Sequence, residues 1–114
     1  MKVGFIGLGN VGGKLSGSLL RNEIELMVHD LNQDLVNDFV SRGAERAHGP
    51  ASMMRDCDVV ITCLPSPAAS AAVMDEMLPE VKEGKIWMEM STTDEAEVKR
   101  LGAMVMERGG AAVD

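Results

Sequence analysis

Three glycines and one carboxylate near the start of the chain have the types and spacing needed to hold a dinucleotide. A short apolar run leads into Gly7, Gly9 and Gly12, and a second apolar run ends at Asp30. In a strand–turn–helix unit the first glycine permits a tight turn, the second lets the backbone approach phosphates, and the third lets the helix pack close to the strand. A carboxylate that ends the second strand can accept hydrogen bonds from the hydroxyls of an adenosine ribose. The pattern therefore predicts a pyrophosphate-binding loop followed by a ribose-binding acid.

Other interpretations of these residues stay open at this point. The glycines could form a turn that binds no ligand, and Asp30 could be an ordinary strand-end carboxylate or the N-cap of a helix over residues 32–42. A site for adenosylmethionine or a flavin is a further alternative, because the riboses of those ligands also suit an acid in this place. The loop is not a Walker A motif, because Lys14 lies two residues after Gly12 and no serine or threonine directly follows it.

The residue after Asp30 bears on which nicotinamide cofactor would fit. A carboxylate repels a 2′-phosphate, and Leu31 puts no arginine next to Asp30 to pair with one. This arrangement favours NAD over NADP. Arg21, Arg42 and Arg46 are the cations that could still fold into the pocket.

Short apolar runs alternate with amphipathic segments of helical length along the whole chain. Strands are predicted over residues 2–7, 25–30, 44–46, 58–64 and 85–90. Helices are predicted over residues 10–22, 32–42, 50–56, 67–78 and 93–108. The fourth and fifth strands are almost continuously apolar, as expected where helices cover both faces of a parallel sheet. The alternation predicts an α/β fold, a doubly wound parallel sheet of Rossmann type in a single three-layer domain.

The last predicted helix carries clear signals at both ends. Thr92 and Glu95 have the spacing of a capping box, in which each side chain satisfies a backbone N–H at the start of a helix. Gly109 is suited to the left-handed conformation that ends a helix. Residues 111–114 then have the composition of a sixth strand.

Composition and charge narrow the class of protein. The 114 residues suffice for one domain, and 46% of them are hydrophobic, enough to form a core. The net charge of −7 argues against nucleic acid as a partner, because phosphate backbones attract clustered lysine and arginine. No apolar stretch approaches the roughly 18 residues of a membrane-spanning helix, and no signal-peptide pattern is expected at the start. Cys57 and Cys63 are the only cysteines, which indicates reduced, core-filling thiols and a cytoplasmic protein.

Four stretches of the sequence stand out together: residues 4–12, 57–65, 90–92 and 109–114. With their spacing they resemble the β-hydroxyacid dehydrogenase family, which includes 3-hydroxyisobutyrate dehydrogenase, tartronate semialdehyde reductase and, more distantly, 6-phosphogluconate dehydrogenase. The resemblance implies a two-domain oxidoreductase that transfers a hydride between NAD(P) and a small 3-hydroxy acid. Residues 1–114 would be its dinucleotide-binding Rossmann domain, and the resemblance leaves open that the enzyme is a homo-oligomer.

The resemblance also implies a role for individual positions. Asp30 would hold the adenosine ribose, Leu64 and Pro65 would line the adenosine side, and Ser91 and Thr92 would lie near the nicotinamide end. The pyrophosphate would be cradled by the loop residues Gly7, Leu8, Gly9, Asn10, Val11 and Gly12. Leu64-Pro65 could equally be a plain strand stop, and Ser91 and Thr92 could be simple helix caps.

The sequence departs from the family pattern at several positions. Lys14-Leu15 stands where the family usually has a proline and a methionine. Glu23 stands where a glycine usually ends the first helix, so Asn22 is expected to take the left-handed conformation instead. The family's substrate-binding Ala-Pro-Val-Ser-Gly-Gly stretch and its helix with the catalytic lysine would follow Asp114.

No residue of the chain is assigned a catalytic role. The lysines at positions 14, 82, 85 and 99 do not match the family's lysine motif. His29 and His48 are the remaining acid–base candidates, and both are expected to be structural or solvated, with His29 on the strand face opposite Asp30. No set of His, Cys or acidic residues has metal-ligand spacing, so no metal site is predicted.

Two functions of different classes follow from these observations. The main hypothesis is the cofactor-binding domain of a hydroxyacid dehydrogenase, inactive alone, whose all-α catalytic and dimerisation domain lies outside these residues. Some of the ten methionines could lie on the surface facing that domain, although core filling is the simpler explanation for most. The alternative is a stand-alone NAD(H)-binding or interaction module without catalysis. A small hydroxy acid is the expected substrate of the whole enzyme, with neither nucleic acid nor membrane as a partner.

Overall fold

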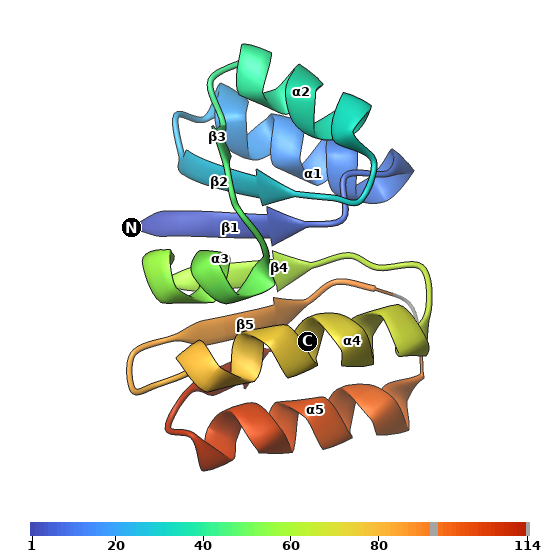
Figure 1. Ribbon diagram of the computed structural model, residues 1–114, viewed down its shortest axis with the longest axis vertical. Coiled ribbons are helices and arrows are strands. Elements are labelled where there is room, and N and C mark those ends of the chain that lie inside the picture. Colours follow the sequence, from blue (N-terminus) through green and yellow to red (C-terminus); the bar gives the residue numbers. More distant parts are fainter. Residues whose placement is uncertain (92–93, 114) are drawn as a thin grey trace.

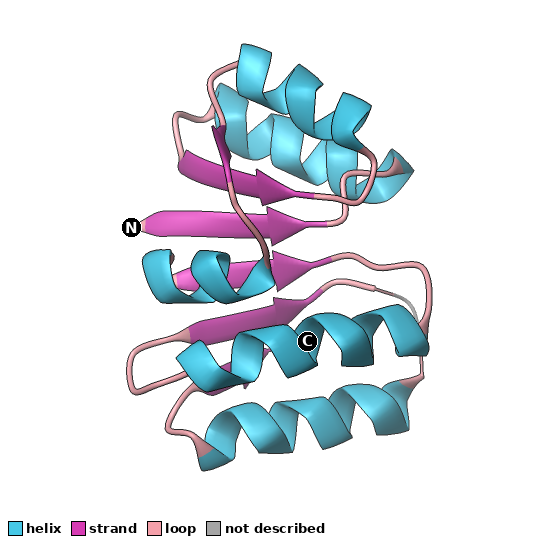
Figure 2. Cartoon of the chain, in the orientation of Figure 1, coloured by secondary structure: helices cyan, strands magenta, loops and turns pink. Residues whose placement is uncertain are grey.

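A computed structural model of the chain describes residues 1–91 and 94–113 as a sheet with helices on both faces (Figure 1). The strands are β1 (Lys2–Ile6), β2 (Glu25–His29), β3 (Glu45–Arg46), β4 (Val59–Thr62), β5 (Ile86–Glu89) and β6 (Ala111–Val113). The helices are α1 (Asn10–Arg21), α2 (Gln33–Ser41), α3 (Pro50–Asp56), α4 (Pro67–Met77) and α5 (Glu95–Glu107), with a 3₁₀ turn η1 (Leu78–Glu80). Strand and helix alternate along the chain (Figure 2).

The strands form one six-stranded sheet in the order β3-β2-β1-β4-β5-β6, and all of their pairings are parallel. The order runs outward in both directions from the β1–β4 pair, as in doubly wound dinucleotide-binding folds. The predicted α/β Rossmann-type sheet is therefore confirmed, and every predicted element is present within two residues of its expected bounds. The turn η1 was not predicted. It follows α4 directly and holds Pro79, whose fixed φ and missing N–H suit a short turn.

The core has two parts, one on each face of the sheet. Phe5 and Val28 belong to the cluster that packs under α1 and α2, whereas Ile6 and Val60 belong to the cluster under α3, α4 and α5. Neighbouring strand residues thus point to opposite faces, as the pleat requires. The methionines mainly fill this second cluster, as expected for most of them. Four of them are completely buried: Met53, Met54, Met74 and Met77.

The helix ends differ from the prediction at two places. The left-handed residue after α1 is Glu23, with φ of +60°, while Asn22 has φ of −96°, so the expectation for Asn22 was wrong. Asn22 instead uses its amide to donate to the Ser18 carbonyl at 2.7 Å. The N-cap of α5 is Asp94, which accepts from Ala96 N at 2.9 Å; Thr92, the predicted cap, lies outside the described residues. Gly109 ends α5 with φ of +89°, as predicted.

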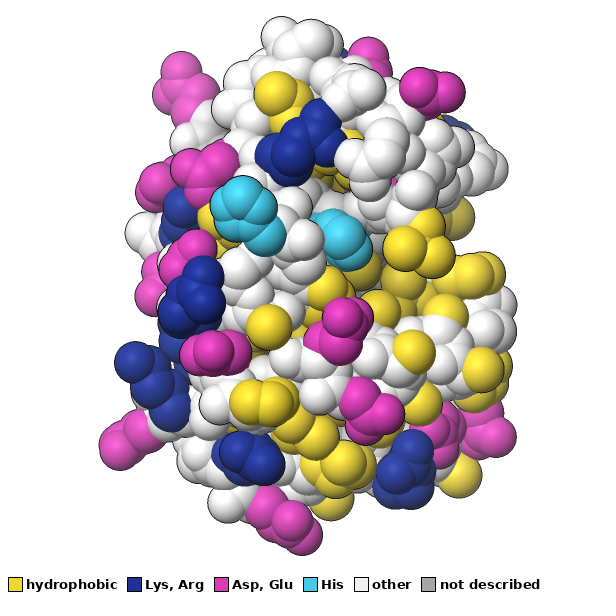
Figure 3. Space-filling view, viewed as in Figure 1, with side chains coloured by type: hydrophobic (Ala, Val, Ile, Leu, Met, Phe, Trp, Pro, Cys, Tyr) yellow, Lys and Arg dark blue, Asp and Glu magenta, His cyan; other side chains and the backbone are white. Residues whose placement is uncertain are grey.

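Strand register brings three connecting loops to one edge of the sheet. Ile6 at the end of β1 lies opposite Thr62 of β4, and Thr62 lies opposite Glu89 at the end of β5. The chain therefore leaves β1, β4 and β5 side by side, at the arrowheads on the right of Figure 1. Hydrophobic side chains gather on this side of the molecule, over the start of α4, whereas charged side chains line the opposite side (Figure 3). In this fold class the carboxyl edge is where ligands bind.

Candidate cofactor site

The glycine loop between β1 and α1 turns sharply at Gly7. Gly7 has φ of +102°, and a Cβ atom there would lie 2.1 Å from the carbonyl oxygen of Cys63. Its N–H donates to the carbonyl of His29 at 3.1 Å. Only glycine can satisfy both the positive φ and the close approach to the chain that leaves β4. The expected role of the first glycine as a tight turn is confirmed.

The other two glycines of the motif have different surroundings. A Cβ atom at Gly12 would lie 1.9 Å from the carbonyl oxygen of Gly7, so the third glycine lets α1 pack against the turn. A Cβ atom at Gly9 would meet no protein atom within 4 Å. The second glycine is therefore not required for packing within the described residues. Its bare backbone faces open space, as expected where a ligand approaches the loop.

The first turn of α1 is open to an anion. Gly9 is the N-cap and provides no side-chain hydrogen bond, and the first turn holds no acidic residue. Asn10 and Val11 are exposed. The N–H groups of a helix's first turn lack partners within the helix and carry the positive end of its dipole, so they attract a phosphate.

Asp30 joins the end of β2 to the glycine loop. Its Oδ2 accepts from Leu8 N at 2.7 Å, and its Oδ1 accepts from Asn32 N at 2.8 Å. The N-cap of α2 is Asn32, whose side chain accepts from Asp34 N at 3.0 Å, so the alternative role of Asp30 as that cap was wrong. The partly exposed carboxylate thus lies directly beside the loop, where the site prediction puts the ribose.

Hydrogen bonds join the chain segments that leave β4 and β5. Leu64 N donates to Ser91 Oγ at 2.6 Å, and Met90 N donates to the Thr62 carbonyl at 2.9 Å. Ser66 caps α4, so Leu64 and the exposed Pro65 form the connection before that helix. The structure thus brings Leu64 and Ser91 together at the carboxyl edge, while the predicted site residue Thr92 lies outside the described residues.

Comparison with known proteins settles the family. The sequence model for the NAD binding domain of 6-phosphogluconate dehydrogenase matches residues 2–114. This chain belongs to that family of NAD-binding domains. It is 33% identical to mitochondrial 3-hydroxyisobutyrate dehydrogenase of Rattus norvegicus, over 98% of this chain and 34% of that protein. It is 30% identical to glyoxylate/succinic semialdehyde reductase 1 of Arabidopsis thaliana, over all of this chain and 40% of that protein.

Solved structures agree on the fold of this NAD-binding domain. A structure of Mycobacterium tuberculosis 3-hydroxyisobutyrate dehydrogenase with L-serine superposes with a TM-score of 0.89 at 20% identity, over 97% of this chain and 38% of that one. The resemblance to the hydroxyacid dehydrogenases is therefore confirmed, and the named relatives are oxidoreductases. The chain spans 34% to 40% of the length of the two curated relatives.

Two of the arginines considered as possible partners of a 2′-phosphate, Arg42 and Arg46, make contacts with α2. Arg46 donates to Gln33 Oε1 at 2.6 Å and also contacts Asn37 Oδ1, while Gln33 Nε2 donates to the Asp30 carbonyl at 3.1 Å. Arg46 is thus linked to Asp30 through a single side chain. Arg42 instead pairs with Asp38 at 3.2 Å.

A buried polar group under the loops was missed by the sequence analysis. Glu89 is 3% exposed at the end of β5, and its carboxylate accepts from Thr62 Oγ1 at 3.0 Å and from Ser91 N at 2.7 Å. Trp87 Nε1 donates to Thr62 Oγ1 at 3.0 Å. The available signal was a single acid inside a nearly apolar strand, since acids are rarely fully buried without partners.

The two thiols of the domain are unbonded and structural. Burial raises the pKa of Cys57 to about 11, and burial together with the nearby Glu89 carboxylate raises the pKa of Cys63. Both therefore stay protonated at neutral pH and are poor nucleophiles. Among the described residues there is no cluster of His, Cys, Asp or Glu able to hold a metal ion. Within the same residues, none of the helices has the length and apolar character to cross a membrane.

Proposed function

We propose that this chain is the dinucleotide-binding domain of an NAD-dependent oxidoreductase that acts on a small 3-hydroxy acid of the 3-hydroxyisobutyrate type. The observation that carries the proposal is the contact of Asp30 Oδ2 with Leu8 N at 2.7 Å, beside the open space over Gly9. It supports the proposal because the carboxylate suited to a ribose lies next to the helix start suited to a phosphate, at the edge of the sheet where ligands bind in this fold class. When bound, the nicotinamide ring of NAD would donate or accept the hydride.

Each part of the cofactor has residues suited to it. The amides from Gly7 to Gly12 would hold the pyrophosphate, and Asp30 would accept from the ribose hydroxyls of the adenosine. Leu64 and Pro65, in the connection between β4 and α4, would line the adenosine. Ser91 and Thr92 would meet the nicotinamide end.

The proposed preference for NAD over NADP rests on charge. The carboxylate of Asp30 would repel a 2′-phosphate, and the adjacent Leu31 is 93% exposed and offers no positive charge. Arg46 is linked to Asp30 through Gln33, but both of its contacts with α2 engage its guanidinium. Accepting NADP would require Arg46 to break these contacts.

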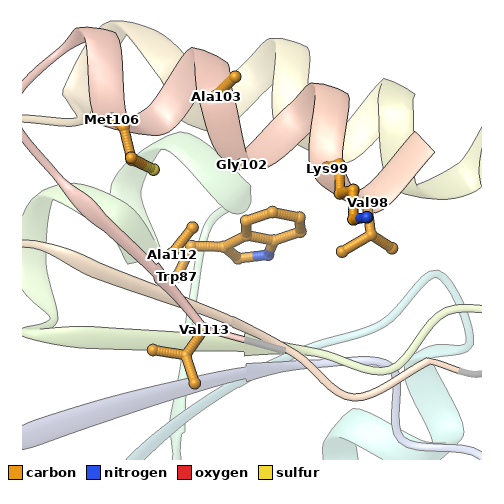
Figure 4. Close-up of a pocket in the computed structure, with 8 residues that line it drawn as sticks. All are labelled: Trp87, Val98, Lys99, Gly102, Ala103, Met106, Ala112 and Val113. Carbon is orange, nitrogen blue, oxygen red and sulfur yellow. The ribbon is translucent and has the colours of Figure 1, made fainter. Parts of the chain in front are cut away.

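Substrate chemistry would need further parts of a larger protein. The chain spans about two fifths or less of its curated relatives, and a general acid or base for the hydroxyl is not assigned to any of its residues. The surface between α5 and β6 supports an adjoining domain. A hollow of about 260 Å³ there is lined by Trp87, Val98 and Met106 among others, mostly with apolar side chains (Figure 4). Met106 is 62% exposed and Val113, on the edge strand, is 46% exposed.

The proposed setting of the enzyme is the cytoplasm, with a small hydroxy acid as substrate. The two unbonded thiols suit a reducing compartment. The proposed larger protein would carry its catalytic and dimerisation surfaces on the adjoining all-α domain, which would make a homo-oligomer.

Binding and turnover measured on the same protein test this proposal. Titration with NADH, followed by nicotinamide fluorescence, should saturate at micromolar to millimolar concentrations, with NADPH binding more weakly. Incubation of the chain with NAD and a panel of 3-hydroxy acids should produce no NADH. Tight binding of neither nucleotide would refute the cofactor site. Robust turnover would show that the residues for catalysis lie within this chain.

A further inference from the structure

Glu89 is a buried carboxylate whose presence packing alone does not explain. Its side chain is 3% exposed, and both oxygens are engaged: Oε2 with the Thr62 hydroxyl and Oε1 with Ser91 N. A buried carboxylate costs free energy even when it is satisfied, and an apolar side chain of similar volume fills such a space as well or better. The groups that hydrogen-bond to its two oxygens should therefore explain why an acid occupies this position.

The carboxylate sets the direction of each hydrogen bond around it. The indole N–H of Trp87 can only donate, so the Thr62 oxygen accepts from it and the Thr62 hydroxyl donates to Glu89 Oε2. All three side chains lie on the face of the sheet under α4 and α5, because Trp87 and Glu89 are two residues apart on β5 and Thr62 lies opposite Glu89. The Thr62 hydroxyl therefore links the Trp87 indole to the Glu89 carboxylate.

The same carboxylate fixes Ser91, the first residue of the loop after β5 with a hydroxyl. Glu89 Oε1 holds the Ser91 N–H at 2.7 Å, and the Ser91 Oγ then lies 2.6 Å from Leu64 N. Because Oγ accepts from Leu64, its own proton points away from that N–H. The Ser91 proton is therefore left to bond an acceptor other than Leu64, at the carboxyl edge where the cofactor is proposed to bind.

We propose that Glu89 is a positioning residue for the cofactor, which holds the Ser91 hydroxyl as a hydrogen-bond donor to the nicotinamide ribose. Glu89 acts only through Ser91, since it is itself enclosed under α4 and α5. The inference rests on the proposed function, because it assumes that NAD occupies the carboxyl edge with its nicotinamide half near Ser91.

The test compares two ligands that share the adenosine and the two phosphates. NADH carries the nicotinamide ribose and ADP does not. Glu89→Met removes both acceptors while keeping the side-chain volume, so it should weaken NADH about tenfold and change ADP by less than about twofold. Glu89→Gln keeps an oxygen for Ser91 N–H and should retain most of the NADH affinity. Glu76→Met, at an exposed position on α4, is the matched control and should change neither ligand.

The outcomes separate this inference from the function on which it rests. If the unaltered chain binds neither ligand, the cofactor site itself is refuted. If it binds ADP and NADH equally, or if Glu89→Met weakens both to the same extent, the positioning role of Glu89 is refuted while the cofactor site stands. Should Glu89→Met fail to fold, the amide hydrogen-exchange rates of Ser91 and Leu64 in the unaltered chain test the inference instead. Rapid exchange at Ser91 and Leu64 would show that the loop is not held and would overturn the inference.

Discussion

The carboxylate of Asp30 accepts a hydrogen bond from the backbone N–H of Leu8 across 2.7 Å. The two residues are 22 positions apart, and the contact joins the end of β2 to the glycine loop after β1. The loop is thus held in shape by the acid that is proposed to bind the ribose. Hydrogen bonds to a charged acceptor contribute roughly 1.5–3 kcal/mol, so the contact with Leu8 stabilises the loop, and the same carboxylate is the one proposed to bind the ribose.

Replacing Asp30 should therefore affect cofactor choice as well as affinity. Asp30→Ala is expected to weaken NADH binding about tenfold or more, because the ribose hydroxyls lose a charged acceptor. NADPH binding should fall less, because the repulsion of its 2′-phosphate is removed, and the NADPH-to-NADH affinity ratio should rise. Calorimetric titration with both nucleotides measures this, and Asp75→Ala on the exposed side of α4 is the control. An unchanged ratio would mean that Asp30 does not contact the ribose.

Alanine substitutions at Gly9 and Gly12 should have different effects, the first on cofactor affinity and the second on stability. Gly12→Ala puts a Cβ atom 1.9 Å from a backbone oxygen that cannot move aside, so the free energy of unfolding should fall by about 2 kcal/mol or more. Gly9→Ala meets no protein atom within 4 Å and has an ordinary φ of −69°, so stability should change by less than about 0.5 kcal/mol. NADH affinity of Gly9→Ala should nevertheless fall at least about tenfold, because the methyl group occupies the space of the phosphates.

Urea unfolding and NADH titration of both glycine variants provide the measurements. The expected result is a stable Gly9→Ala variant that binds poorly and an unstable Gly12→Ala variant. If Gly9→Ala bound NADH as tightly as the unaltered chain, the phosphates would not lie against this loop.

Glu23 offers a stabilising substitution. It holds φ of +60° after α1, a conformation that costs roughly 1 kcal/mol or more for a residue with a Cβ atom. Glu23→Gly should raise the free energy of unfolding by about 0.5–1 kcal/mol, after the greater entropy of glycine in the unfolded chain is subtracted, and the melting temperature by roughly 2–4 °C. Asn22→Gly should give no gain, since Asn22 has a negative φ and its side chain binds the Ser18 carbonyl. Equal effects at both positions would contradict this explanation.

The sequence was sufficient for the fold because its local signals agree with one another. The apolar runs alternate with amphipathic segments, and Gly7 and Gly12 stand where the turn and the close helix contact need them. What it could not supply were contacts between distant segments. Thr62 and Glu89 are 27 residues apart and become neighbours only through strand register. No local pattern marks such a pair.

The sequence also did not show which of two similar nearby residues caps or ends a helix. Thr92 and Asp94 both have side chains that can cap a helix, and the point at which the chain turns into α5 selects Asp94. In the same way, α1 ends at Arg21, which moves the left-handed position to Glu23 although asparagine tolerates that conformation better.

Cys57 should make stability fall at alkaline pH. Burial raises its thiol pKa from 9.0 to about 11 on folding, so the unfolded chain releases this proton first as the pH rises. Below pH 9 the group is protonated in both states and has no effect, whereas between pH 9 and 11 unfolding is increasingly favoured, by about 2 kcal/mol in total. Urea unfolding of the unaltered chain and of Cys57→Ala at pH 8, 9, 10 and 11 measures the difference. Cys57→Ala loses core contacts at every pH, so its free energy of unfolding should be lower than that of the unaltered chain. This difference should shrink as the pH rises. A difference in unfolding free energy that stays constant would mean that the thiol does not titrate in this range.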